Sequence, residues 1–342
     1  MVEKSGSRIA ALLAVFAGFV VYGADAGAAG PESRCEGLVC IDLFEVGDVR
    51  NPPDAESGHG RVDHSFAVTR GEITLEQYVT FLNAVAADLS MLAPTQRETI
   101  EALWQEDMFK TYDYVSPHGA ISRSGSGTGT DPYIYREAPD LALGAHSVLR
   151  PALYISWFSA ARFANWLHNG GKNGSDTETG AYSLEYRQNG IAARNPDARW
   201  WIPSADEWYK AAFYDPTKPG GNPYWLYPTR SDELPVAEMP PGGANSANYN
   251  SMAPDGRKLT AVGSFAGTAS HYGAQDLAGS MWEWTDTPVL NHDGEPETMI
   301  VMGGSWSLGL INVSKFGARD YLPSSSDDDT GFRLATTTKS SK

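Results

Sequence analysis

The sequence predicts an α+β domain with little regular secondary structure, and two observations support this fold class. Helix signals come early in the chain and strand candidates come late, with long irregular connections, which is typical of α+β folds rather than of a doubly wound sheet. The composition includes 35 Gly, 21 Pro, 10 Trp, 16 Tyr and 12 Phe, which suits short elements joined by shaped turns and packed by aromatic rings. With 342 residues, of which 42% are hydrophobic, the chain can fill such a core.

Capping residues predict three helices, which follow Thr74, Ser156 and Ser204. Gln77 and Glu207 stand three residues after the first and third of these caps, which is the spacing of a capping box. Apolar residues then repeat at helical spacing, and Gly170 with Gly171 ends the second helix. Strand candidates lie at residues 64–74, 199–203, 261–265, 299–306 and 330–336, and a Ser/Gly-rich run at 122–132 predicts a flexible loop.

The N-terminus has the layout of a secretory signal. Lys4 and Arg8 precede an apolar run over residues 9–21, and small residues at 26–28 offer A-x-A-like cleavage sites. The run is short for a membrane span, and a single-pass anchor remains the alternative. We therefore expect an exported protein, periplasmic or extracellular, that is not embedded in a membrane.

The expected organisation has four parts: a signal peptide at 1–28, an N-terminal segment at 29–40, one domain at 41–337 and a tail at 338–342. Charges cancel within the first part, so the mature chain keeps the net charge of −16. Such a chain repels phosphate backbones, and nucleic acid is not an expected partner. The two cysteines, Cys35 and Cys40, are predicted to form a disulfide in an oxidising compartment, with a redox or metal pair as the alternative.

The common catalytic patterns are missing from the chain. It contains no GxSxG, no HExxH, no Walker-type phosphate loop and no GxGxxG between a strand and a helix. No ligand spacing relates the seven histidines, which we expect to be exposed or hydrogen-bonded: His59, His64, His118, His146, His168, His271 and His292.

Two segments carry oxygen ligands in patterns that are typical of calcium sites. Asp276 and Glu283 flank a Gly-containing turn in "DLAGSMWEW", and such turns can direct carbonyl oxygens at a hard cation such as calcium. Upstream, "NYNSMAPDGR" offers a similar set in Asn248, Tyr249, Asp255 and Arg257. The alternative is that Asp276 caps a turn while Glu283 pairs with a buried arginine, such as Arg319 or Arg333.

Six blocks appear in order along the chain: "ITLEQYVTFLNAV", "PALYISWFSAARFANWL", "WWIPSADEWYKAA", "TAVGSF…YGAQDLAGSMWEWTD", "MGGSW" and "TGFRLA". Together they resemble the formylglycine-generating enzyme family, also called the sulfatase-modifying factor domain, over about residues 41–337. The resemblance implies the family's variant of the C-type-lectin-like fold, a mixed α+β domain stabilised by calcium.

By position, the resemblance implies two structural calcium sites. Asp276, Gly279, Met281 and Glu283 match one, with Gly279 and Met281 contributing carbonyl oxygens. Asn248, Tyr249, Asp255 and Arg257 match the other. Glu283 is then expected to be a calcium ligand rather than a catalytic acid, and its neighbours Trp282 and Trp284 to pack in the core.

The resemblance breaks at the residues that carry the family's oxidation. In formylglycine-generating enzymes, two cysteines after the "GGS" segment hold copper(I), which prefers soft thiolates. Leu308 and Val313 stand at those positions, so copper and the conversion of a sulfatase cysteine to formylglycine are not expected.

Near the equivalent cleft, five residues are candidates to bind a ligand: Ser305, Trp306, Ser307, Asn312 and Arg319. The alternative is that Ser305 and Arg319 satisfy buried polar groups in core strands. The acidic run Asp327, Asp328 and Asp329 is expected to be solvated.

Two functions follow as hypotheses, and no catalytic residue is assigned in either. The first is an exported, calcium-stabilised domain that binds a small molecule, a glycan or an exported protein. The second is an exported oxidative tailoring enzyme that uses another cofactor in the same cleft. Fold resemblance alone does not decide between them.

Overall fold

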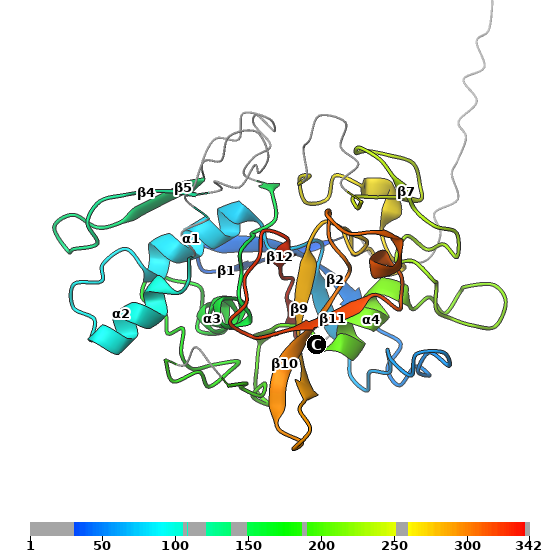
Figure 1. Cartoon of the computed structure of the whole chain (residues 1–342), viewed down its shortest axis with the longest axis horizontal. Helices are drawn as coiled ribbons and strands as arrows, with labels where there is room; N and C mark the ends of the chain where they lie inside the picture. The colour runs from blue at the N-terminus through cyan, green and yellow to red at the C-terminus, as the bar shows by residue number, and fades with distance from the viewer. Residues whose placement is uncertain are drawn as a thin grey trace, which may run out of the picture.

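The computed structural model describes residues 31–104, 108, 121–137, 149–186, 190–250 and 259–338 (Figure 1). The helices are α1 (Leu75–Val85), α2 (Pro94–Glu101), α3 (Trp157–His168) and α4 (Ala205–Phe213), with 3-10 turns η3 (Ala266–Thr268) and η4 (Leu310–Val313). The strands are β1 (Glu32–Glu36), β2 (Val39–Val46), β3 (Phe66–Thr69), β4 (Ile121–Ser124), β5 (Ile134–Glu137), β6 (Trp200–Trp201), β7 (Val236–Ala237), β8 (Ser246–Ala247), β9 (Trp282–Leu290), β10 (Pro296–Met302), β11 (Ala318–Tyr321), β12 (Thr330–Gly331) and β13 (Ala335–Thr336).

Two sheets organise these elements. The larger has the order β1-β2-β3-β13-β6, so the last strand of the chain pairs between β3 and β6. The second has the order β11-β10-β9-β12, with β12 parallel to β9. Figure 1 shows α1 and α2 on one side of these strands and α4 on the other, while the far end of the β9–β10 hairpin projects from the body. In the described part of the chain, no helix is long and apolar enough to cross a membrane.

The three predicted helices are confirmed as α1, α3 and α4, each with its predicted cap. Thr74 and Ser204 form complete capping boxes with Gln77 and Glu207. Helix α2 was not predicted, because its segment lacks an apolar period and its N-cap, Ala93, offers no side-chain acceptor.

The strand predictions hold less well. Residues 261–265 do not form a strand: Gly263 has φ +77° and donates its N–H to the Asp276 carboxylate instead of to a neighbouring strand. The loop predicted at 122–132 begins inside β4, which pairs with β5. Strands β1 to β3 precede the first helix, so the α+β class is confirmed but the expected order of helices before strands is wrong.

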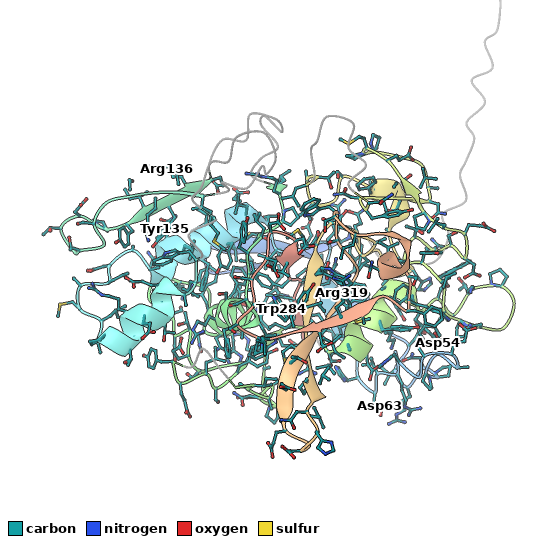
Figure 2. The ribbon with its side chains drawn as sticks, in the orientation of Figure 1. Asp54, Asp63, Tyr135, Arg136, Trp284 and Arg319 are labelled. Carbon is teal, nitrogen blue, oxygen red and sulfur yellow. A yellow bond between two sulfur atoms is a disulfide. The ribbon has the colours of Figure 1, made fainter. Side chains whose placement is uncertain are left out.

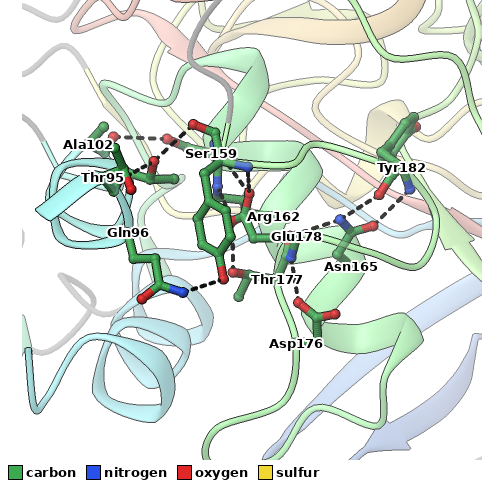
Figure 3. A network of polar contacts seen from close by, with 12 residues as sticks. Thr95, Gln96, Ala102, Ser159, Arg162, Asn165, Asp176, Thr177, Glu178 and Tyr182 are labelled. Carbon is green, nitrogen blue, oxygen red and sulfur yellow. Dashed lines mark hydrogen bonds and ion pairs between the residues drawn. The ribbon is translucent and has the colours of Figure 1, made fainter. Parts of the chain in front are cut away.

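Helix α3 is buried on nearly every side and carries a polar network into the core (Figure 3). Arg162 donates from Nε to Glu178 Oε1 at 2.6 Å and from Nη2 to Oε2 at 3.0 Å. Asn165 donates to the carbonyl oxygens of Thr177 and Tyr182 at 2.8 and 2.9 Å. These bonds fix the irregular segment after α3, which has little secondary structure of its own.

We expect Arg162→Met to lower the unfolding free energy by about 3–5 kcal/mol, because it leaves the Glu178 carboxylate buried without its counter-charge. The double variant Arg162→Met with Glu178→Gln should lose less, since the substituted amide is neutral and its oxygen could still accept the Tyr186 N–H that Glu178 accepts at 2.7 Å. Chemical denaturation measures both. Arg61→Met, which breaks the exposed pair with Asp63, is the control and should change stability by less than about 1 kcal/mol. A double variant as unstable as Arg162→Met would contradict this account.

Candidate functional site

Glu283 of β9 forms a buried ion pair with Arg333. Arg333 Nη2 donates to Glu283 Oε1 at 2.7 Å, and its Nε donates to Oε2. Trp208 of α4 donates its indole N–H to Oε2 at 2.6 Å. Both side chains of the pair are fully buried, so of the two arginines considered from the sequence, Arg333 is the partner of Glu283.

Two further carboxylates lie near this pair. Glu72 follows β3 and is 3% exposed, and among the described residues neither of its carboxylate oxygens has a partner at hydrogen-bond geometry. Burial, together with Asp276 and Glu283 nearby, raises the pKa of Glu72 well above its usual range, and the Arg333 guanidinium and the Ser280 hydroxyl oppose only part of this rise. Burial also raises the pKa of Asp276 to about 6, although the Gly263 N–H stabilises its charged form. Three buried carboxyl groups thus surround one guanidinium, so protons or a cation must balance the excess negative charge.

The structure brings parts of the two predicted calcium sets together. Asn248 and Gly279 form a β-bridge, and the Ser280 N–H donates to the Asn248 carbonyl oxygen at 2.8 Å. Gly279 has φ +79°, and a Cβ there would lie 2.0 Å from the same carbonyl oxygen, so only glycine fits. Asn248 and Asp276 also line one cavity of about 10 Å³, which is room for a single water-sized species.

The positions of the remaining members of the two predicted calcium sets do not indicate whether they bind a cation. Met281 is fully buried at the end of this turn, and Tyr249 is buried with its hydroxyl on the Pro235 carbonyl oxygen. Asp255 and Arg257 lie outside the described residues. Trp282 and Trp284 are fully buried, as expected for core packing.

The donor set near Asp276 fits a cation only with help from the backbone. Among the residues that the structure describes, no three His, Cys, Asp or Glu side chains are grouped to hold a metal ion. Calcium accepts backbone carbonyl oxygens as readily as carboxylates, and the carboxylate oxygens of Glu72 are of the type that it prefers. The calcium assignment therefore stays a prediction, and Glu72 is a candidate that sequence spacing missed.

Apolar packing surrounds the two positions that carry thiolates in the family resembled. Val313 is 1% exposed and packs with Ala247, Tyr249 and Ala278. Leu308 is half-buried against the main core. Gly304 of the "GGS" segment, with φ +77°, would bring a Cβ within 3.1 Å of Val313 Cγ1.

Ser305 and Ser307 share one acceptor, Asp329. Their hydroxyls lie 2.7 and 3.0 Å from Asp329 Oδ2 and 3.0 Å from each other. The expectation that the whole acidic run is solvated is wrong for Asp329, which is half-buried and holds this loop. Ser305 itself is fully buried, and its hydroxyl is hydrogen-bonded to Asp329. This agrees with the interpretation of Ser305 as a residue that satisfies buried polar groups.

The other cleft candidates differ in exposure. Trp306 is buried, whereas Asn312 donates its side-chain N–H to the Gly309 carbonyl oxygen at 3.1 Å. Arg319 belongs to the edge strand β11, is exposed, and its guanidinium lies 5.3 Å from the Trp282 ring centroid (Figure 2). The interpretation of Arg319 as a residue of a core strand is therefore wrong.

Cys35 and Cys40 face each other across the β1–β2 hairpin and are joined by a disulfide. Four of the histidines have polar partners: His59 with Asp206, His64 with Glu207, His168 with the Arg199 N–H, and His271 with Asp215. His118 and His146 lie outside the described residues.

The described residues also line two open clefts. One, of about 550 Å³, includes Asp42, Arg70, Glu72 and Gln77 in its lining. The other, of about 510 Å³, includes His64, Arg194 and Trp201. None of the five cleft candidates from the sequence lines either of them.

The sequence matches the family "Sulfatase-modifying factor enzyme 1-like domain" over residues 4–338. The chain belongs to this family. Its C-type-lectin-like α+β fold, implied by the resemblance of the sequence blocks, is thereby confirmed. Membership of the family does not settle the reaction, because the thiolates of its copper site are absent here.

Among known proteins, hercynine oxygenase of Mycolicibacterium smegmatis is 30% identical over 134 residues, which is 33% of this chain and 28% of that protein. The match thus spans little more than a quarter of that relative's length. Treponema denticola variable protein 1 is similar in structure, with a TM-score of 0.51 and 16% identity over 90% of this chain and 99% of its own. CarF has a TM-score of 0.49 and 18% identity over 87% of this chain and 99% of its own. The likeness to the Treponema denticola protein, at 16% identity, concerns the fold alone.

The geometry predicts the behaviour of Glu283→Gln. We expect this variant to lose about 3–5 kcal/mol of stability, because Arg333 loses the charge of the carboxylate that it contacts directly. The loss should be equal in calcium and in chelator, as measured by thermal unfolding under both conditions. Asp276→Asn, which leaves the ion pair intact, is the matched variant and should lose the calcium-dependent part of the stability. A Glu283→Gln variant that is destabilised only in calcium would instead make Glu283 a ligand.

Proposed function

We propose that this protein is an exported, calcium-stabilised ligand-binding domain that has lost the copper oxidase chemistry of its family. The observation that carries the proposal is that the chain has no free cysteine to serve as a copper ligand. The chain has only two cysteines, and they are bonded to each other in the β1–β2 hairpin. Copper(I) depends on soft ligands, and leucine and valine side chains supply none.

Calcium is proposed as the counter-charge for the buried carboxyl groups. Asp276 and Glu72, with the carbonyl oxygens of Gly279 and Met281, would hold it, and Asn248 and Tyr249 would belong to a second site. When bound, calcium supplies charge compensation and rigidity, not redox chemistry. The raised pKa values of Glu72 and Asp276 support this proposal, since both express the cost of burying negative charge without a cation.

The proposed ligand surface lies over the Ser307 loop and strand β11. The hydrogen bond between Ser305 and Asp329 fixes the loop on its buried side. Ser307 and Asn312 are half-buried, and Arg319 is exposed. These groups could bind the polar part of a small molecule, a glycan or a segment of an exported protein. The alternative function, an oxidative tailoring enzyme with another cofactor, is supported by the partial similarity to a protein named as an oxygenase.

Elemental analysis separates the two functions. Protein expressed with its N-terminal segment and purified without chelator should contain calcium and no stoichiometric copper, iron, manganese or zinc. One equivalent of a redox metal would favour the oxidative enzyme and overturn the proposal of a binding domain.

A gain of copper binding tests the position of the lost site. The double variant Leu308→Cys with Val313→Cys should bind one copper(I) per chain, because it restores two thiolates beside the "GGS" segment. The natural chain, titrated in parallel with copper(I), should bind none tightly. Equal binding by both proteins would place a copper site elsewhere in the chain.

A further inference from the structure

A second cleft opens beside strands β3 and β13 and the edge strand β6 of the larger sheet. His64 and Ser65 precede β3, Thr337 and Thr338 follow β13, and Trp201 ends β6. The cleft has a volume of about 510 Å³, which is within the range of pockets for small ligands. It belongs to neither the proposed calcium sites nor the Ser307 surface.

A buried carboxylate fixes the imidazole of His64 in this cleft. Glu207 lies 2.8 Å from His64 Nε2 and also accepts the Ser204 N–H at 2.7 Å and the Trp201 indole N–H at 3.1 Å. Burial alone would raise the pKa of Glu207, but hydrogen bonds from His64, Arg194 and Ser204 outweigh it and lower the pKa to about 2. Glu207 is therefore ionised and can only accept, so Nε2 of His64 carries the proton.

This arrangement leaves the other ring nitrogen available. With its proton on Nε2, neutral His64 presents an unprotonated Nδ1, which has no hydrogen-bond partner among the described residues. Half of the side chain is exposed, at 52%. A carboxylate that orients a histidine in this way prepares the opposite nitrogen to accept a proton or a hydrogen bond.

The charge of the surroundings limits which ligand the cleft can take. Arg194 donates to Glu207 at 2.9 Å and lies 3.3 Å from Asp286, so its charge is already balanced by buried carboxyl groups. Burial raises the pKa of Asp286 to about 7. The cluster of Arg194, Glu207 and Asp286 behind the cleft therefore has a net charge that is zero or slightly negative. An anion would gain little from Arg194, and among the described residues that line the cleft there is no carboxylate to receive a cation.

We infer that this cleft binds a small, uncharged ligand rich in hydroxyl groups, such as a monosaccharide, with His64 Nδ1 accepting a ligand O–H. The Ser65 and Thr338 hydroxyls lie 3.4 Å apart, so one of them donates to the other. Together with the Thr337 hydroxyl they still offer a ligand two O–H donors and several acceptor sites. The Nη2 group of Arg194 makes no hydrogen bond to a described residue and can donate to a ligand oxygen. The site is separate from the proposed binding surface, so either one can fail without the other.

The test uses nuclear magnetic resonance on the full mature chain with labelled histidine. The nitrogen shifts of His64 should report the Nε2–H tautomer. Titration with glucose, galactose and N-acetylglucosamine should move the signals of His64 and Thr338 saturably for at least one sugar. Acetate and inorganic phosphate, titrated alongside, should bind more weakly than that sugar.

His64→Gln is the decisive variant, because a Gln amide nitrogen can keep the bond to Glu207 while Nδ1 is lost. Sugar affinity should fall at least about tenfold, as for one lost ligand hydrogen bond. His292→Gln, at the exposed turn of the β9–β10 hairpin, is the control and should bind normally.

Three outcomes would overturn the inference. They are a His64 protonated on Nδ1, the absence of any sugar-dependent shift at His64, and tighter binding of acetate or phosphate than of every sugar. If His64→Gln does not fold, the titration of the natural chain still decides between these outcomes.

Discussion

The pair between Arg333 and Glu283 is the interaction on which the rest of the structure depends. Arg333 lies between β12 and β13, and besides Glu283 of β9 it binds the carbonyl oxygens of Thr69, at the end of β3, and of Gln275. One guanidinium thereby joins the two sheets, and the Trp208 indole brings α4 to the same carboxylate. A buried charge is tolerated only when its donors and acceptors are satisfied, so the geometry around Arg333 fixes where all these elements meet. The pair neutralises only one carboxylate, and Glu72 and Asp276 are left as the excess that a proton or calcium must balance.

Local chemistry explains which parts of the fold the sequence predicted. Thr74, Ser156 and Ser204 act within one turn of their helices, so their caps are visible in a short window of sequence. Strand β9 was missed because "SMWEWTD" is buried on successive positions and shows no alternation, its partners being distant in sequence. The hairpin of β1 and β2 was missed for the opposite reason, since only its cysteines gave a signal and they were interpreted as a loop ahead of the domain. Residues 261–265 have strand-like composition, yet the Asp276 carboxylate captures the Gly263 N–H.

Site residues were predictable only where neighbours in sequence share a role. Spacing indicated Asp276, Gly279 and Glu283 as site residues. The sequence left two arginines as possible partners of Glu283, because distances in space cannot be deduced from a single sequence. Glu72 had no signal in the sequence, and its importance follows from two buried oxygens that have no partner at hydrogen-bond geometry in the part of the chain that the structure describes. Glu207 was identified as a capping residue, and it is one. The same carboxylate also orients His64, 143 positions away, and that second role is visible only in the fold.

The replacement of the thiolates changes what the "GGS" segment can do. In a copper site the loop must keep two soft ligands accessible. Here Val313 is buried beside the loop, and Asp329 accepts hydrogen bonds from the hydroxyls of Ser305 and Ser307. Apolar burial at Val313 favours a rigid loop without any metal, since a buried side chain of this size contributes about 1.5–3 kcal/mol. A loop held by packing keeps its accessible polar groups in fixed positions, which suits the ligand surface that we propose over Ser307 and β11. Apolar packing at Val313 and the hydrogen bonds from Ser305 and Ser307 to Asp329 thus hold this loop.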